Sequence, residues 1–331
     1  MSVNRLIRTQ VHISLHHRRT YAYHSTNDDF DNDDLCPSWL YRNFWLELVM
    51  LSKWDIVSEK LLFYLNRNHE SVIDGLNSFL GLKGEYLLAN EVPPNLFVGN
   101  PKILQPGKCI ALIGINPAYR PNDSSFLESE INLPRSCLEK WRLSKDTKDL
   151  QPWFSKMENF FIGSSYYGQY FTRLGNIIGQ GIFSETWSSY KGQKSARMTF
   201  HKHVLKFDIL PYYSKKAGFN NQLLHEIYSS DPALIAYQEY ISSMIDFANP
   251  RFVILNGMSV TSVVKELFAT EDFTTINLGP TPRTEIQVGK ISINGSVVNA
   301  LGVKFVNSIH GPTSDQDWEY IWQAWNTLEI I

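Results

Sequence analysis

Four short apolar runs, separated by longer stretches with helical periodicity, dominate the chain from residue 108 onward. The runs extend from Cys109 to Ile115, from Val204 to Leu210, from Phe252 to Leu255 and from Val303 to Ile309. Apolar runs that alternate with helices are typical of buried parallel strands covered by helices on both faces. The pattern therefore predicts an α/β fold, a three-layer sandwich with a central four-stranded, mostly parallel sheet.

The segments between and after the runs carry apolar residues at the three- and four-residue spacing of amphipathic helices. Asp231 is predicted to cap one helix, with Pro232 at its first position, and Ser314 or Thr313 is expected to cap the last helix. The predicted apolar faces consist of Phe171, Leu174, Ile177 and Ile178; of Val260, Val263, Val264 and Leu267; and of Trp318, Ile321, Trp322 and Trp325.

The first third of the chain has a different organisation. Residues 1–35 are predicted to be a tail and linker, because residues 1–26 carry four arginines and no acid, and five aspartates follow between residues 28 and 34. Residues 36–107 form a predicted helical region, with a Trp-rich helix over 38–65 and a second helix after it, and we find no candidate chemistry there. The α/β domain is predicted over residues 108–331.

Composition narrows the class of protein. With 43% hydrophobic and 19% charged residues, the chain can bury a large core, and most of it is not disordered. A net charge of −2 excludes a uniformly basic nucleic-acid binder, although a local basic face is still possible. Three separated cysteines favour a reducing compartment, and the sequence has no membrane-length apolar run and no signal peptide. We expect a cytoplasmic monomer with no membrane partner, metal or cofactor.

Polar residues follow the predicted strands at the edge where open parallel sheets bind ligands. Asn116 follows the first run, Asp208 lies near the end of the second, Asn256 follows the third and His310 follows the fourth. Asn, Asp and His suit hydrogen bonding to a heterocycle, whereas Gly, Pro and Ser at turns allow close backbone approach to a phosphate. Backbone or phosphate contacts are expected from Gly114, Pro117, Ala118, Gly311, Thr313 and Ser314.

Two of these strand ends resemble motifs of the uracil-DNA glycosylase superfamily. Residues 114–118 read Gly-Ile-Asn-Pro-Ala and resemble the Gly-Ile-Asn-Pro-Gly motif of its mismatch-specific branch. Residues 310–314 read His-Gly-Pro-Thr-Ser and resemble the His-Pro-Ser-Pro motif, with Gly311 inserted. Residues 168–174 resemble the start of the helix after the base-stacking loop. The resemblance covers about residues 108–325 and implies a metal-independent, monofunctional DNA N-glycosylase.

The resemblance also implies roles for individual residues. Asn116 would orient the water that attacks C1′, and His310 would donate to the pyrimidine O2 as the base leaves as an anion. The alternatives are a turn residue that caps a helix for Asn116 and a core histidine for His310. A flipped base must be held between side chains. The candidates for that contact are Tyr119, Phe161, Tyr166 and Tyr167. The alternative for each of them is a core residue.

Asp208 departs from the family, which usually has Asn at this strand end. An ionised carboxylate repels the O4 of uracil and accepts a hydrogen bond from the N4 amino group of cytosine, so Asp208 favours a cytosine-type base. The alternative is that Asp208 faces away and caps a helix. A second departure is the stretch of about fifty residues between Asn116 and Tyr166. This stretch either forms a wall of a larger pocket for a bulky 5-substituent or lies on the surface with no part in the pocket.

A local basic stretch fits a phosphate-contacting face. Residues 187–207 carry five basic residues and no acid, and Lys215 and Lys216 follow. A solvated loop is the alternative. The basic residues of the stretch are Lys191, Lys194, Arg197, Lys202 and Lys206.

The favoured function is excision of a modified pyrimidine from DNA, leaving an abasic site. Asp208 favours a 5-modified cytosine, as in phage DNA, and hence antiviral defence. The alternatives are a uracil or mismatch repair glycosylase, a non-catalytic nucleic-acid-binding module on the same fold, and a small-molecule enzyme on a doubly wound sheet. The sequence lacks a Walker A loop, a Gly-x-Gly-x-x-Gly turn after the first strand, a zinc-deaminase signature and a Gly-x-Ser-x-Gly nucleophile elbow.

Overall fold

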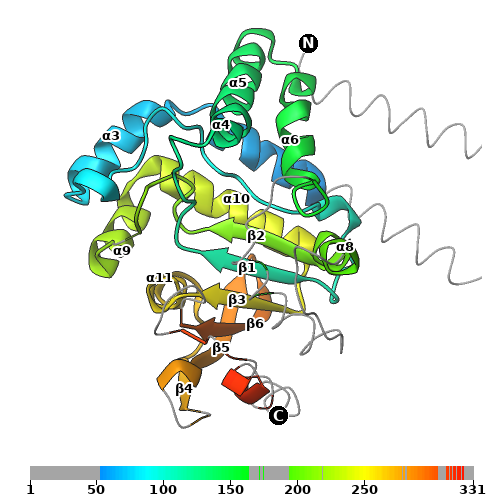
Figure 1. The fold of residues 1–331 in the computed structure, drawn as a ribbon, viewed down its shortest axis with the longest axis vertical. Coiled ribbons are helices and arrows are strands. Elements are labelled where there is room, and N and C mark those ends of the chain that lie inside the picture. Colours follow the sequence, from blue (N-terminus) through cyan, green and yellow to red (C-terminus); the bar gives the residue numbers. More distant parts are fainter. Residues whose placement is uncertain are drawn as a thin grey trace, which may run out of the picture. The chain divides into compact units, whose positions relative to one another are not determined.

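Six strands form one mixed sheet among the described residues of the computed structural model (Figure 1). The structure describes residues 53–163, 194–217, 219–277 and 282–304, together with residues 171, 174, 279, 311, 312, 314, 316, 317, 319–321 and 323. The sheet order is β2-β1-β3-β6-β5-β4. The strands are β1 (Ile110–Gly114), β2 (Val204–Asp208), β3 (Phe252–Asn256), β4 (Thr274–Asn277), β5 (Glu285–Ile293) and β6 (Ser296–Val303).

The α/β class is confirmed, but the sheet is larger than predicted. Strands β2, β1, β3 and β6 pair in parallel, whereas β5 runs antiparallel to both β6 and β4. The two extra strands were missed because they are only partly buried, so their sequences do not read as continuous apolar runs.

The fourth predicted strand was misplaced. Residues 303–309 were expected to form it, but β6 occupies Ser296–Val303 and shares only Val303 with that run. Residues 305–310 lie outside the described part of the chain. A hairpin connects β5 to β6 through Asn294 and Gly295, whose φ angles of 49° and 84° suit the two-residue turns that join antiparallel strands.

Helices cover the sheet, and the central strands bury side chains on both faces. Ile110 and Leu112 of β1 belong to one apolar cluster, with Phe200 of α8, whereas Ala111 and Ile113 belong to a second. The helices are α3 (His69–Phe79), α4 (Ser124–Phe126), α5 (Leu133–Ser144), α6 (Gln151–Glu158), α8 (Lys194–His203), α9 (Asn221–Ser230), α10 (Pro232–Ala248) and α11 (Met258–Phe268), with a further helix over residues 53–65. A π-helix covers Leu127–Asn132, and short 3₁₀ helices cover Gly84–Tyr86, Pro101–Ile103, Thr147–Leu150 and Pro282–Thr284.

Two predicted helix caps are confirmed. The Asp231 side chain accepts hydrogen bonds from the backbone N–H groups of Ala233 and Leu234, both at 2.9 Å, and Pro232 is the first residue of α10. Near the C-terminus, Ser314 Oγ accepts from Asp317 N at 3.1 Å, and Asp317 Oδ2 accepts from Ser314 N at 3.0 Å. This reciprocal pair is a capping box and identifies Ser314 as a cap.

The described part of the N-terminal region packs into the core of the sheet domain. The Tyr64 and Tyr212 hydroxyls lie 3.1 Å apart, and Val98 exchanges backbone hydrogen bonds with Lys206 of β2. All described residues belong to one compact unit that covers residues 50–331. The predicted tail over residues 1–35 lies outside the described residues. Within the described ranges, no helix has both the length and the apolar character to cross a membrane.

His69, at the start of α3, is buried against tyrosines. Its Nδ1 lies 3.2 Å from the Tyr212 hydroxyl, and Tyr64 packs edge-on against the imidazole ring at 4.8 Å between centroids. The pKa of His69 is lowered to about 3. Burial is the largest cause, and the positive charges of Arg142 and Arg67 lower the pKa further. The neutral imidazole is therefore the form that the folded protein accommodates.

Acid should destabilise the protein through His69. The pKa of His69 is lower in the folded state than the value near 6.5 in the unfolded state, so the unfolded chain takes up the proton first as the pH falls. The contribution to stability is lost between about pH 6.5 and 3, at roughly 1.4 kcal/mol per pH unit. We expect His69→Phe to flatten this slope in urea unfolding at pH 7 and pH 5. Equal pH slopes in both proteins would contradict the assignment.

Candidate functional site

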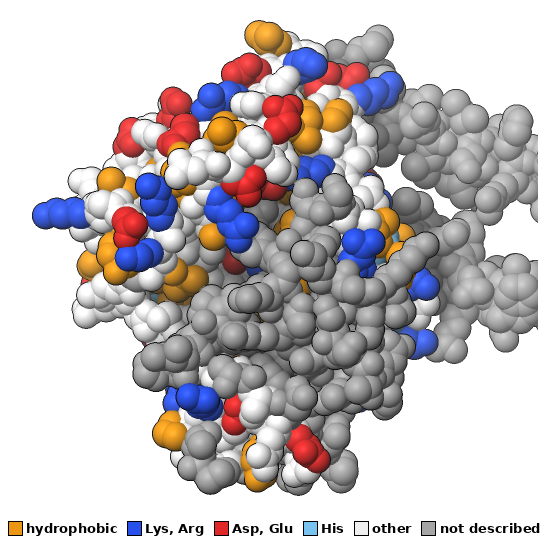
Figure 2. Space-filling view, viewed as in Figure 1, with side chains coloured by type: hydrophobic (Ala, Val, Ile, Leu, Met, Phe, Trp, Pro, Cys, Tyr) orange, Lys and Arg blue, Asp and Glu red, His pale blue; other side chains and the backbone are white. Residues whose placement is uncertain are grey.

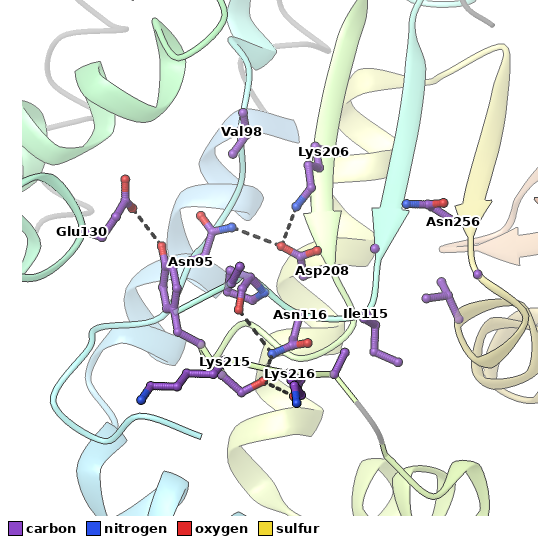
Figure 3. Close-up of a pocket in the computed structure, with 18 of the residues that line it drawn as sticks. Asn95, Val98, Ile115, Asn116, Glu130, Lys206, Asp208, Lys215, Lys216 and Asn256 are labelled. Atoms are coloured by element: carbon purple, nitrogen blue, oxygen red, sulfur yellow. Dashed lines mark hydrogen bonds and ion pairs between the residues drawn. The ribbon is translucent and has the colours of Figure 1, made fainter. Parts of the chain in front are cut away.

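A cavity of about 650 Å³ lies at the carboxyl ends of β1, β2 and β3 (Figure 3). Its lining includes residues 114–118 at the end of β1 and beyond it, Asp208 and residues 213–217 at the end of β2 and beyond it, and residues 256–260 at the end of β3 and beyond it. Because β2 and β3 flank β1 on opposite sides, this edge is a topological switch point, where doubly wound sheets bind ligands. The volume lies within the range of about 300–1,000 Å³ that small-molecule sites occupy.

The Asn116 side chain is held in one orientation. Its Nδ2 donates to the Tyr212 carbonyl at 3.2 Å, to the Pro117 carbonyl at 3.3 Å and to Ser214 Oγ at 2.7 Å. Carbonyl oxygens only accept hydrogen bonds, so the nitrogen must face them, and the amide oxygen points the other way (Figure 3). Among the described residues Oδ1 has no hydrogen-bond partner, so this lining residue offers the cavity an acceptor.

Both loops around Asn116 are fixed. Buried Ser214 donates from its Oγ to the Lys216 carbonyl at 2.8 Å, so this oxygen is an acceptor toward Asn116. The Ser214 backbone also bonds to Pro117 and Tyr119, which joins the loop after β2 to the loop after β1. The site is therefore preorganised, with its polar atoms positioned before a ligand arrives.

Asp208 ends β2 and is buried at the cavity wall. Its Oδ2 accepts from Lys206 Nζ at 2.6 Å and from Asn95 Nδ2 at 3.2 Å (Figure 3). Its backbone oxygen accepts from the Tyr237 hydroxyl at 2.9 Å. The carboxylate is 2% exposed, and its hydrogen-bond donors among the described residues are the Lys206 and Asn95 side chains, not the backbone N–H groups of a helix start. Lys206 was expected on a phosphate-contacting face, but its side chain lies in the cavity wall and is 12% exposed, because Asp208 needs a counter-ion there.

Gly114 leaves room for this carboxylate. A Cβ at position 114 would lie closer to Asp208 Oδ1 than real Cβ contacts allow. We expect Gly114→Ala to push the Asp208 side chain off the wall and to lower the free energy of unfolding by about 1–3 kcal/mol, measured in urea. Gly75→Ala in α3 is the control, because nothing lies within 4 Å of the added carbon and helix propensity predicts a gain of up to about 1 kcal/mol. Equal effects of the two substitutions would show that the Gly114 contact is unimportant.

The aromatic wall differs from the one predicted. Phe161 is fully buried in the core, 5.2 Å from Phe171 and 5.3 Å from Phe200 between ring centroids, whereas its neighbour Phe160 is half-buried and lines the cavity. The prediction therefore missed the lining phenylalanine by one residue in a turn, where no periodicity fixes which side chain points inward. Further lining aromatic residues are Phe126, Phe171, Tyr213 and Phe219.

Tyr119 is not one of the residues that line the cavity. It packs edge-on against Phe126, with 5.9 Å between centroids, and its hydroxyl donates to Glu91. Burial and this bond to a carboxylate raise the pKa of Tyr119 to about 12. Its contacts therefore favour a role in packing the loop after β1.

The remaining predicted site residues fall into three groups. Gly114, Pro117 and Ala118 line the cavity. Gly311, Ser314 and Arg197 are described but are not among the lining residues, and Arg197 donates to the Gly163 carbonyl at 3.5 Å. Lys194 begins α8, and its side chain lies outside the described part of the structure. His310, Tyr166, Tyr167, Thr313 and Lys191 lie outside the described residues.

Several lining residues were not predicted. Asn95 comes from residues 36–107, where we found no candidate chemistry in the sequence. The connection between β1 and β2, which includes α4, α5 and α6 above β2 in Figure 1, supplies Phe126, Glu130, Lys156 and Phe160. The long connection therefore forms a cavity wall. Its outer surface carries intermingled acidic and basic side chains (Figure 2).

Four lysines line the cavity among the described residues, and three form ion pairs. Lys206 pairs with Asp208, Lys156 with Glu130, and Lys216 with Glu85 at 2.5 Å. The fourth, Lys215, is exposed and has no hydrogen bond or ion pair to a described residue. No group of three or more potential metal ligands gathers within the described ranges.

Comparison with protein-family models, with curated proteins and with solved structures finds no match for this chain. What the cavity can do follows from its own groups. An open amide oxygen on Asn116, a carboxylate held by Lys206 and several aromatic rings surround one space. This set suits a planar heterocycle that donates and accepts hydrogen bonds, with a water placed beside it.

Proposed function

We propose that this protein is a monofunctional DNA glycosylase with a uracil-DNA-glycosylase-like fold. It hydrolyses the N-glycosidic bond of a flipped-out pyrimidine, by preference a 5-modified cytosine as in phage DNA, and leaves an abasic site. The observation that carries the proposal is the orientation of Asn116, whose amide oxygen is open to the cavity at the position where the motif resembles that of the superfamily.

Asn116 supports hydrolysis by orienting a water molecule. As the C1′–N1 bond breaks, the base takes the bonding electrons and the sugar becomes cation-like. A water that donates a hydrogen bond to Asn116 Oδ1 directs its lone pair at C1′ and adds there. The proton it loses passes to solvent, and the departing base anion takes up a proton from solvent to become the neutral free base. An amide is a weak base, so Asn116 orients this water more than it deprotonates it. His310 is proposed to donate to the departing base.

Asp208 favours an amino-bearing base. Its Oδ2 is occupied by Lys206 and Asn95, which leaves Oδ1 to accept from an exocyclic amino group such as N4 of cytosine. A uracil in the same position would bring O4 against the carboxylate. Phe160, which is half-buried, lines the cavity and packs against Phe171 at 5.7 Å between ring centroids, offers an apolar surface against which a flipped base can pack.

Excision from a set of DNA duplexes tests this function. Each duplex carries one cytosine, uracil or 5-substituted cytosine, a metal chelator is present, and alkali cleaves the strand at abasic sites. We expect cleavage at the substituted cytosine, and we expect Asp208→Asn to shift preference toward uracil. Cleavage at uracil alone would reject the cytosine preference, and DNA binding without any abasic site would favour the non-catalytic binding module.

A further inference from the structure

The cavity has a second polar region, which comes from a connection between strands, whereas Asp208 belongs to a strand of the sheet. Glu130 comes from the π-helix Leu127–Asn132, and Lys156 comes from α6, so both belong to the long connection between β1 and β2. The other lining residues of the long connection are apolar: Phe126, Met157, Phe160 and Phe171. Glu130 and Lys156 are about one-fifth exposed, which leaves them accessible from the cavity.

The hydrogen bonds of this pair to described residues leave one acceptor and one donor unsatisfied. Glu130 Oε1 accepts hydrogen bonds from the Lys156 ammonium and from Ser129 Oγ, and Oε2 accepts one from the Tyr213 hydroxyl at 2.8 Å. Lys156 also donates to the Ser129 carbonyl at 2.7 Å. A carboxylate has about four acceptor sites and an ammonium has three donors, so one acceptor on Glu130 and one donor on Lys156 have no partner among the described residues. A hydroxyl group, which both donates and accepts, satisfies this pair.

Stability alone gives a weak reason for an ion pair in this wall. The desolvation of a partly buried pair largely offsets its attraction, so apolar residues of the same volume would serve the fold equally well. A six-residue π-helix is rare, and such segments occur frequently at functional sites. Both observations favour a role for Glu130 and Lys156 in ligand contact.

We infer that Glu130 and Lys156 form a subsite for a hydroxyl group on the substituent of the excised base. This inference rests on the proposed glycosylase function and defines its substrate more closely. The preferred base carries a hydroxylated substituent, and an alkyl substituent of the same size is a poorer substrate. Glu130 and Lys156 are specificity-determining residues in this account, and neither takes part in breaking the glycosidic bond.

Single-turnover rates on two matched DNA duplexes test the inference. One carries 5-hydroxymethylcytosine and the other carries 5-ethylcytosine, which differ by a hydroxyl in place of a methyl group. We expect the protein to prefer the first, and we expect Glu130→Gln and Lys156→Met to reduce this preference about ten- to hundredfold by slowing the first substrate alone. Glu158→Gln is the control, because Glu158 also pairs with a lysine, Lys102 at 2.7 Å, but does not line the cavity.

The outcomes separate this inference from the proposed function. An unchanged preference in Glu130→Gln and Lys156→Met, or an equal change in Glu158→Gln, would overturn the subsite while base excision stands. Variants that fold poorly would lose the 5-ethylcytosine reaction as well, so that reaction reports folding. If the unaltered protein excises neither base, the proposed preference for a 5-modified cytosine fails. In that case we measure equilibrium binding of the same two duplexes. The subsite stands if the protein binds the 5-hydroxymethylcytosine duplex more tightly and Glu130→Gln removes this difference, and it is overturned if the two duplexes bind equally.

Discussion

Asn116→Ala is expected to reduce base excision by about 10²- to 10⁴-fold while DNA binding stays nearly unchanged. The substitution removes the amide oxygen that orients water, but it leaves the lysines around the cavity in place. Excision is measured as the single-turnover rate, and binding is measured by fluorescence anisotropy of labelled DNA. An Asn116→Ala protein with normal turnover would show that water is oriented by another group.

A companion substitution tests whether the orientation of the amide matters. Ser214→Ala keeps Asn116 but removes one of the acceptors that hold its nitrogen, at 2.7 Å. We expect a smaller loss of rate than in Asn116→Ala, because the Tyr212 and Pro117 carbonyls still bind the nitrogen. A loss larger than that of Asn116→Ala would mean that Ser214 acts on the substrate directly.

Lys206→Met should lower the free energy of unfolding by about 3–5 kcal/mol. The substitution leaves the buried Asp208 carboxylate with Asn95 as its remaining side-chain donor, and an unpaired buried charge is strongly destabilising. Urea unfolding measures the loss. The double substitution Lys206→Met with Asp208→Asn removes both charges and should recover much of the stability.

An exposed ion pair provides the control. Lys60 and Glu239 lie 2.6 Å apart, but their side chains are 38% and 46% exposed, so Lys60→Met should cost no more than about 1 kcal/mol. If Lys206→Met lowers the free energy of unfolding no more than Lys60→Met does, Asp208 does not depend on Lys206 as its counter-ion.

The part of the fold that could be predicted is the part buried on both faces. Strands β1, β2 and β3 begin and end within two residues of the predicted runs, because continuous apolar sequences follow from burial on both sides. The β5–β6 hairpin was missed, although Asn294 and Gly295 between alternating apolar residues are a strong hairpin signal. Recognising this turn would have placed β6 before residue 303.

The candidate site also contains residues that the sequence pattern predicted and residues that it did not. Asn116 and Asp208 were identified because they stand at strand ends, which a parallel sheet brings to one edge. Asn95, Glu130 and Lys156 come from connections whose path over the sheet is set by tertiary packing, and no local spacing marks them. The ion pair between Lys206 and Asp208 has a sequence signal, since residues two apart on a strand share a face.

The most direct test of the account is the identity of the released product. A duplex with one 5-hydroxymethylcytosine is incubated with excess protein and a metal chelator, and mass spectrometry detects what leaves the DNA. We expect the free base in solution, an abasic strand of matching amount, and at least about a hundredfold slower release of both with Asn116→Ala. An intact strand, or release of a nucleotide in place of a free base, would contradict hydrolysis of the glycosidic bond of a 5-modified cytosine by this protein.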